Sequence, residues 1–272
     1  MHMTVIEPPR RLNLPRWTDL WHAREVVNRL AMRDIIVRYR QTVLGIAWVI
    51  IQPVMSAGVF SLVFGTVAGL SSDGLPFFLF TLAGMLAWNV FNGTLLRASG
   101  SLGANQALVS KVFFPRILVP ISTVASVILD FLVGLAVAVI LLFVYGVNPG
   151  WPVLLIPVWV VLIAMLGLGV GIATSAMMVK YRDVGYILPW VMQILLYASP
   201  VAYSLNSAPA NLRWVFEINP ITWFLQAFRW SLVGAEAPPM WQILGLVGIA
   251  IVVLFAGILY FQSSERQFAG II

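Results

Sequence analysis

The feature that most constrains this chain is its long stretches without a single charged side chain. Residues 131–179 form one of 49 residues, and residues 41–72 form another of 32. A helix needs about 20 apolar residues to cross a bilayer, so each stretch is long enough to cross. Only 10% of all residues are charged, against about 25% in a typical soluble domain. The chain is therefore predicted to be an all-α integral membrane protein.

Charged and turn-forming residues divide the apolar sequence into six predicted transmembrane helices. The 49-residue stretch is too long for one crossing and breaks at Gly146–Pro152, a run of turn residues. The predicted spans are 41–72, 74–96, 117–145, 153–179, 184–203 and 240–262. Residues 1–40 are expected to form a cytoplasmic N-terminal segment, 41–262 the transmembrane domain and 263–272 a cytoplasmic tail.

The basic residues predict the orientation of these spans. Of the 16 Lys and Arg residues, 14 fall on the side of the N-terminus, and only Arg213 and Arg229 fall on the other. Because cytoplasmic loops carry the excess of Lys and Arg, both termini are expected in the cytoplasm. No apolar run follows the start closely enough for a cleavable signal peptide. The basic residues follow membrane topology, so nucleic-acid binding is not expected.

The segment from Asp19 to about Arg40 has the pattern of an amphipathic helix. Its apolar face holds Leu20, Ala23, Val27, Leu30 and Ala31, and its polar face holds His22, Glu25, Arg29 and Arg33. With Trp21 near its start, this helix is expected to lie among lipids at the cytoplasmic interface. A generic membrane anchor and a contact with a partner subunit both fit the pattern.

Two connections are too apolar for plain loops. Ser99–Arg116 predicts a short cytoplasmic helix rather than a solvated connector, since the run Val112-Phe113-Phe114 needs a surface that buries it. Ser204–Pro239 predicts two short helices at the outer side, the second of them capped by Asn219 and started by Pro220. The aromatic residues of this segment also fit a structural belt at the membrane interface.

The chemistry that is missing excludes several classes of function. The only lysines are Lys111 and Lys180, and neither follows a Gly-rich loop, so no phosphate-binding loop for ATP is present. There are no cysteines, and the only histidines are His2 and His22. We therefore predict no catalytic, cofactor-binding or metal-binding residues and no enzyme activity in this chain.

The predicted spans contain one acidic residue and two series of regularly spaced small residues. Asp130 is predicted about thirteen residues into its span, and no titratable group is expected at similar depth in the other spans, which favours a structural over a proton-carrying role. Small residues recur four apart at Ser61-Gly65-Gly69 and Gly167-Gly171-Ser175. This spacing permits close helix packing, inside one subunit or across a dimer.

Several motifs resemble those of bacterial polysaccharide exporters. Arg38-Tyr39-Arg40-Gln41-Thr42-Val43-Leu44-Gly45-Ile46-Ala47-Trp48 with Gln52-Pro53 resembles the entry to the first span of type-2 ABC permeases that export O-antigen, teichoic acid and capsule. Tyr181-Arg182-Asp183 is similar to the family's cytoplasmic turn. Ser199–Ser204 and Asn219-Pro220-Ile221 are similar to its outer-side blocks.

The resemblance implies a homodimeric permease in the bacterial inner membrane with two copies of a separate ATPase, which holds the ATP and Mg. The cargo would be an undecaprenyl-diphosphate-linked polysaccharide. Asp19–Arg33 would be the interface helix, with Trp21, Arg24, Arg29 and Arg33. The ATPase-coupling helix would use Ser101, Leu108, Lys111, Val112, Phe113 and Phe114. The helices between Ala208 and Gly234 would be periplasmic gates. Candidates for the translocation path or gate are Trp88, Phe91, Asp130, Tyr197, Trp214, Trp223, Phe224 and Arg229.

Other functions stay open at this point. A drug or small-lipid exporter of the same superfamily would share the fold. A membrane-embedded glycosyl- or acyltransferase and a passive scaffold are disfavoured, because catalytic clusters are missing and the resemblance is to exporters.

Overall fold

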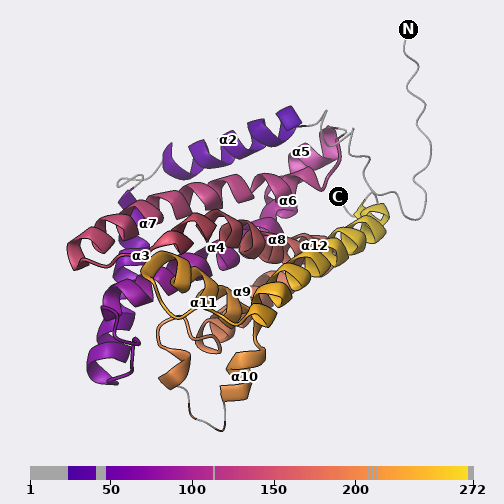
Figure 1. The fold of residues 1–272 in the computed structure, drawn as a ribbon. Helices are drawn as coiled ribbons and strands as arrows, with labels where there is room; N and C mark the ends of the chain where they lie inside the picture. The colour runs from indigo at the N-terminus through magenta and orange to yellow at the C-terminus, as the bar shows by residue number, and fades with distance from the viewer. Residues whose placement is uncertain are drawn as a thin grey trace.

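The computed structural model describes residues 24–40, 47–112, 114–207, 209, 211 and 213–268, and these residues form helices and connecting turns without a β-strand (Figure 1). The helices in chain order are α2 Arg24–Arg40, α3 Ala47–Phe60, η1 Ser61–Val67, α4 Phe77–Ala104, α5 Gln106–Lys111, α6 Leu118–Ser122, α7 Val124–Tyr145, η2 Trp151–Leu155, α8 Ile156–Lys180, α9 Val184–Tyr197, η3 Leu205–Ser207, α10 Arg213–Ile218, α11 Pro220–Val233 and α12 Met240–Phe268. Trp21 and Phe113, both predicted above as functional, lie outside the described residues.

Five of the helical segments are long and apolar enough to cross a membrane. They are Ala47–Val67, Phe77–Ala104, Leu118–Tyr145, Trp151–Lys180 and Met240–Glu265. These agree with five of the six predicted spans, and the chain is a multi-pass, all-α membrane protein. The first of them ends in a π-helical segment, η1.

The fifth predicted span is shorter than expected. The predicted range continued to about Tyr203, but α9 ends at Tyr197 after 14 residues. A helix of that length rises about 21 Å, against about 30 Å for the hydrocarbon core. The helix ends here because Pro200 lacks a backbone N–H and disfavours helical geometry in Ser199. The chain then turns, and Asn219 Nδ2 donates to Ser199 Oγ over 2.9 Å.

Local signals set other boundaries as predicted. Helix α7 ends at Gly146, whose φ of 66° is the left-handed conformation that favours glycine. Helix α11 starts as the sequence indicated, because the Asn219 side chain accepts a hydrogen bond from the Ile221 N–H over 3.0 Å, with Pro220 in the first turn.

Helices α4 and α8 form the centre of the molecule, and α7, α11 and α12 pack around them (Figure 1). A Cβ on Gly167 would lie 2.8 Å from the Phe91 carbonyl oxygen of α4, so glycine sets the α4–α8 distance. Gly169, on another face of α8, approaches α12 in the same way, with Leu254 N 2.7 Å from the site of its missing Cβ. The small residues of α8 therefore serve packing inside one subunit.

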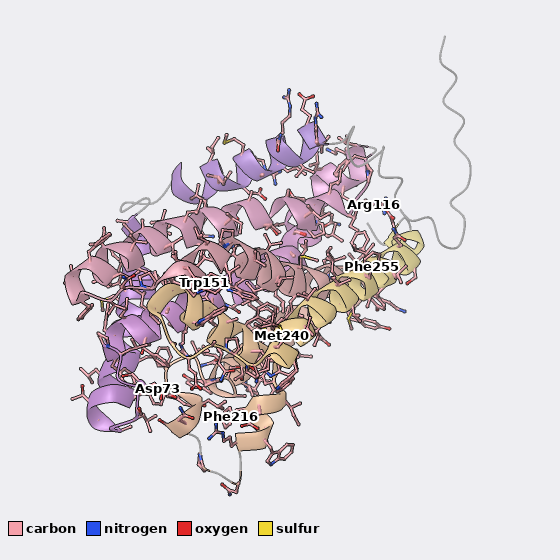
Figure 2. The ribbon with its side chains drawn as sticks, viewed as in Figure 1. Asp73, Arg116, Trp151, Phe216, Met240 and Phe255 are labelled. Atoms are coloured by element: carbon pink, nitrogen blue, oxygen red, sulfur yellow. The ribbon has the colours of Figure 1, made fainter. Side chains whose placement is uncertain are left out.

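The connections gather at two opposite ends of the bundle, as alternating crossings require. At one end, Leu30 of α2, Val109 of α5, Ala176 of α8 and Phe261 of α12 share one apolar cluster. At the other, the Ser204 N–H donates to the Ser71 carbonyl over 3.2 Å, which joins the connections after α3 and α9. Figure 2 shows Arg116 toward the first end and Asp73 and Phe216 toward the second. We call these the inner and the outer end, following the predicted orientation.

Candidate functional site

The predicted coupling segment begins later than expected. Ser101 is buried in the last turns of α4 and donates to the Ala98 carbonyl, so it does not present a surface to a partner. The short helix is α5, and its buried Val109 packs on the inner apolar cluster beside partly buried Leu108 and Phe114. Lys111 and Val112 are exposed at its end. The exposed residues of this segment also include Gln106, Ala107 and Ser110, so α5 presents a mostly polar surface with one cation near its end.

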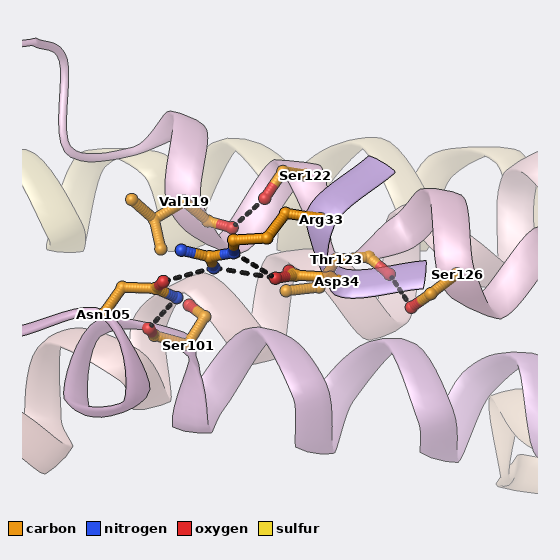
Figure 3. A network of polar contacts seen from close by, with 8 residues as sticks. All are labelled: Arg33, Asp34, Ser101, Asn105, Val119, Ser122, Thr123 and Ser126. Carbon is orange, nitrogen blue, oxygen red and sulfur yellow. Dashed lines mark hydrogen bonds and ion pairs between the residues drawn. The ribbon is translucent and has the colours of Figure 1, made fainter. Parts of the chain in front are cut away.

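A polar contact connects this segment to α2. Arg33 of α2 donates to Asn105 Oδ1 at the α4–α5 junction (Figure 3). The same Asn105 side chain donates from Nδ2 to the Ser101 carbonyl, one turn earlier in α4, over 2.9 Å. Arg33 also pairs with Asp34 over 2.7 Å. This polar contact, between residues 72 apart in sequence, adds to the apolar cluster that Leu30 of α2 and Val109 of α5 share.

The rest of α2 has one buried and one exposed face. Leu30 and Ala31 are buried, whereas Arg24 is exposed and the Arg29 side chain is 81% exposed. Arg29 pairs with Glu25 one turn earlier over 2.8 Å, and this hydrogen bond holds the pKa of Glu25 below its usual value. The location of α2 in the membrane interface stays a prediction.

Asp130 has partners that the sequence did not reveal. Arg97 Nη2 lies 2.5 Å from Asp130 Oδ2, and Arg38 Nη2 lies 3.0 Å from the same oxygen. Arg97 also donates to Ser126 Oγ over 2.7 Å. The expectation that no titratable group lies near Asp130 was wrong, because α4 continues past Leu96 and places Arg97 on the helix face toward α7.

Asp130 lies as deep in its span as the sequence predicted. It is the thirteenth residue of the membrane-spanning segment Leu118–Tyr145 and belongs to the second turn of α7. Its carboxylate borders a cavity of about 140 Å³ between α2, α3, α4 and α7, together with the side chains of Arg38, Gln52, Asn92 and Arg97. Two guanidinium groups contact this one carboxylate, so the site serves as an ion-pair junction of α2, α4 and α7.

The predicted path residues divide into a buried and an exposed group. Trp88, Phe91 and Phe224 are buried in the main apolar core of the subunit. Trp223 is partly buried, donates to the Glu217 carbonyl over 2.6 Å and packs edge-on against Trp241. Tyr197 and Trp214 are exposed. Of the aromatic candidates, only these last two are available to a ligand on the surface of this subunit.

Arg229 is a buried structural cation. Its side chain, 4% exposed, donates from Nη1 to the Pro200 carbonyl over 2.8 Å and from Nη2 to the Val201 carbonyl over 2.5 Å. The guanidinium carbon also lies 3.8 Å from the centre of the Phe80 ring. Backbone carbonyls at membrane depth need partners within the protein, and Arg229 supplies them to the turn after α9. Only the tertiary structure shows this role.

The described residues include no group of three or more His, Cys, Asp or Glu side chains that could hold a metal ion.

The chain is similar to several known polysaccharide transport proteins. The chain is 26% identical to the O-antigen export system permease protein RfbA of Myxococcus xanthus over 253 residues, which covers 92% of this chain and 96% of that protein. It is 27% identical to the protein of the same name from Klebsiella pneumoniae, covering 88% of this chain and 92% of that one. It is 24% identical to the polysialic acid transport protein KpsM of Escherichia coli, covering 88% and 93%.

The O-antigen relatives are named as permeases, not enzymes. The family model described as "ABC-2 type transporter" matches residues 25–233 of this chain. The match extends from α2 to α11 and includes α5 and both short outer helices. Membership of this family implies an ATPase partner. From these results, the chain belongs to the ABC-2 type transporter family.

Proposed function

We propose that this chain is the membrane permease of an ATP-driven exporter that moves a polysaccharide, linked to undecaprenyl diphosphate, out of the cytoplasm. Two copies of the chain would form the path, and two copies of a separate ATPase would drive it. The relatives named for O-antigen and polysialic acid support the choice of polysaccharide.

The observation that carries the proposal is the aromatic stripe of α9. Tyr186, Trp190 and Tyr197 are all exposed, and their spacing places them on one face of the helix. Met192 is the only buried residue of α9. A single subunit therefore leaves an aromatic surface uncovered along one face of α9.

An aromatic stripe suits a moving polymer. Rings present large, flat apolar surfaces with a polar edge in Tyr and Trp, and contact with such a surface does not depend on one exact hydrogen-bond pattern. A path built from two copies of α9 would let successive sugar units slide from ring to ring. In this proposal Tyr197 and Trp214 remain path residues, whereas Trp88, Phe91 and Phe224 support the path from the core.

The inner end would receive the ATPase. Helix α5 and the residues after it, with exposed Lys111 and Val112, would contact the ATPase directly. Arg33 would transmit the movement to α2 through Asn105. Both termini would lie in the cytoplasm and the chain in the bacterial inner membrane.

The test is export in cells that depend on this chain. Depletion should trap undecaprenyl-linked glycan inside the cell. Replacement of Tyr186, Trp190 and Tyr197 together by Ala should slow export severalfold without lowering the amount of ATPase that copurifies. Phe143→Ala, an exposed aromatic position on α7, is the matched control and should leave export unchanged. Unchanged glycan after depletion would refute the proposal.

A further inference from the structure

A second polar cavity, separate from the one beside Asp130, lies at the outer end. It has a volume of about 330 Å³, in the lower part of the range of about 300–1,000 Å³ that is typical of small-molecule sites. Its walls come from Phe80 of α4, from α10 and α11, from the connections after η1 and α9, and from residues 235–242, which join α11 to α12 and begin α12. No single element makes this cavity, so its shape is a product of the tertiary structure.

Two glutamines that line this cavity, Gln226 on α11 and Gln242 on α12, each have a buried side-chain oxygen, Oε1, without a hydrogen-bond donor among the described residues. Gln242 is only 5% exposed. A buried acceptor without a donor is unfavourable, so each amide would gain a hydrogen bond by turning its oxygen toward a ligand in the cavity that brings donors with it.

Several other polar groups of the cavity contact each other. Arg213 pairs with Glu217 over 2.9 Å and reaches Asn206 Oδ1 over 3.4 Å. Asp73 accepts hydrogen bonds from Ser204 over 2.5 Å and from Asn206 over 3.2 Å. These contacts hold the donors and acceptors in place before a ligand arrives, which lowers the entropy cost of binding.

An aromatic ring completes the wall. Trp241 borders the cavity, and its ring is held edge-on by Trp223 at a centroid distance of 5.2 Å. The cavity thus offers a flat apolar face together with amide and carboxylate acceptors.

This combination selects among ligand classes. The carboxylates of Asp73, Glu217 and Glu236 outnumber the guanidinium groups of Arg213 and Arg229, which disfavours a phosphate. A metal ion is disfavoured because the described residues hold no suitable ligand group. A neutral sugar ring, with hydroxyl donors at its edge and an apolar face, matches both the orphaned acceptors and the Trp241 ring.

We propose that this cavity binds a sugar unit of the exported polymer at the outer end of the path. The inference rests on the proposed export function and adds a specific binding site to it. Gln226 and Gln242 would accept hydrogen bonds from sugar hydroxyls, and Trp241 would lie against the ring face.

The experiment uses the full chain in lipid nanodiscs. The probe is the delipidated surface polysaccharide of the source bacterium, cut to fragments of one to three repeats, and inorganic phosphate is the second probe. Binding is measured by calorimetry. The fragments should bind, and Gln242→Leu and Trp241→Ala should each weaken binding at least tenfold. Trp151→Ala, an exposed outer tryptophan away from this cavity, should bind like the unchanged protein.

A second readout separates a binding role from a structural one. Because Oε1 of Gln242 is unpaired, Gln242→Leu should leave the melting temperature unchanged or raise it, whereas a structural glutamine would lower it. If Gln242→Leu does not fold, Trp241→Ala at the exposed rim decides the question. Trp241→Phe should restore part of the affinity.

The possible failures are distinguishable. If the chain exports polymer but the fragments do not bind, or Trp151→Ala weakens binding equally, the cavity is not a sugar site and the export function stands. Competition by phosphate at equal concentration would identify an anion site and overturn the inference. If depletion leaves export intact, the proposed function itself fails.

Discussion

Asp130 is held between two guanidinium groups from different helices. Its side chain is 19% exposed, and the Arg38 and Arg97 nitrogens lie 3.0 and 2.5 Å from one carboxylate oxygen. Without this charge, two partly buried guanidinium groups would lose the carboxylate that they share. The pairing accounts for an acid in an otherwise apolar span without any proton-carrying role.

Neutralising Asp130 is therefore expected to affect stability more than transport. Asp130→Asn should destabilise the protein by about 1–3 kcal/mol, because hydrogen bonds to charged groups are lost and two cations face each other without a counter-charge. The midpoint of thermal unfolding in nanodiscs measures this, and export is then normalised to folded protein. Asp183→Asn, at an exposed position before α9, should change neither value. Loss of export by folded Asp130→Asn protein would instead assign the carboxylate to transport.

At the scale of elements, Arg33 links two helices whose movement the proposed mechanism requires to be coordinated. The contact joins α2 to the α4–α5 junction and involves one side chain from each (Figure 3). A rigid contact of this kind can transmit displacement only while both partners are present.

Removing the Arg33 contact should separate ATP hydrolysis from transport. Arg33→Ala in the reconstituted complex should lower polymer export several times more than ATPase activity. Arg29→Ala is the control, because Arg29 lies one turn away on the same helix and pairs only with exposed Glu25 among the contacts described above. Equal loss of both activities in Arg33→Ala would argue against a coupling role.

The contact between α8 and α12 depends on glycine on both sides. A Cβ on Gly257 would collide with the backbone of Gly169, so the two backbones touch directly. Gly248 on the same α12 has open space at its Cβ position. One helix thus provides both a test position and its control.

Gly257→Ala should destabilise the protein by about 1–3 kcal/mol, the usual range for overpacking a well-packed contact. Gly248→Ala should be neutral or slightly stabilising, because alanine favours the helix and meets no neighbour. Thermal unfolding of both variants measures the difference. Similar midpoints for the two variants would show that the close approach does not limit stability.

At the scale of the whole molecule, the charge distribution predicts which end faces the cytoplasm. Fourteen of the 16 basic residues belong to the inner end in the predicted topology. The chain contains no cysteine, so single engineered cysteines report accessibility without background labelling. Asn148, exposed between α7 and α8, and Ser110, exposed on α5, lie at opposite ends.

A membrane-impermeant maleimide should label Asn148→Cys in intact cells whose outer membrane is permeabilised. It should label Ser110→Cys only after the inner membrane is broken. The positive-inside rule gives the reason, since the cytoplasmic loops collect the Lys and Arg residues. The reverse pattern would invert the orientation and place α5 away from any ATPase.

Much of the architecture was predictable from local patterns. The five long spans, the break at Gly146 and the Asn219 cap of α11 follow from charge-free length, turn residues and capping chemistry. Each of these signals is contained in a few consecutive residues. They are enough to predict a helical membrane protein. A segment inside the bilayer must pair its own backbone N–H and C=O groups, and an apolar segment of this length does so as an α-helix.

The tertiary structure decided the roles of individual side chains. It paired Arg97 and Arg38 with Asp130, directed Arg229 to the carbonyls after α9 and buried Ser101, Trp88, Phe91 and Phe224. It also assembled the outer cavity from segments that are far apart in the sequence. The sequence could not settle these points, because they depend on which helix faces meet, and the helices here are apolar on nearly every face. Hydropathy shows that such helices lie in the membrane. Which helices pack against each other depends instead on where small residues allow close approach.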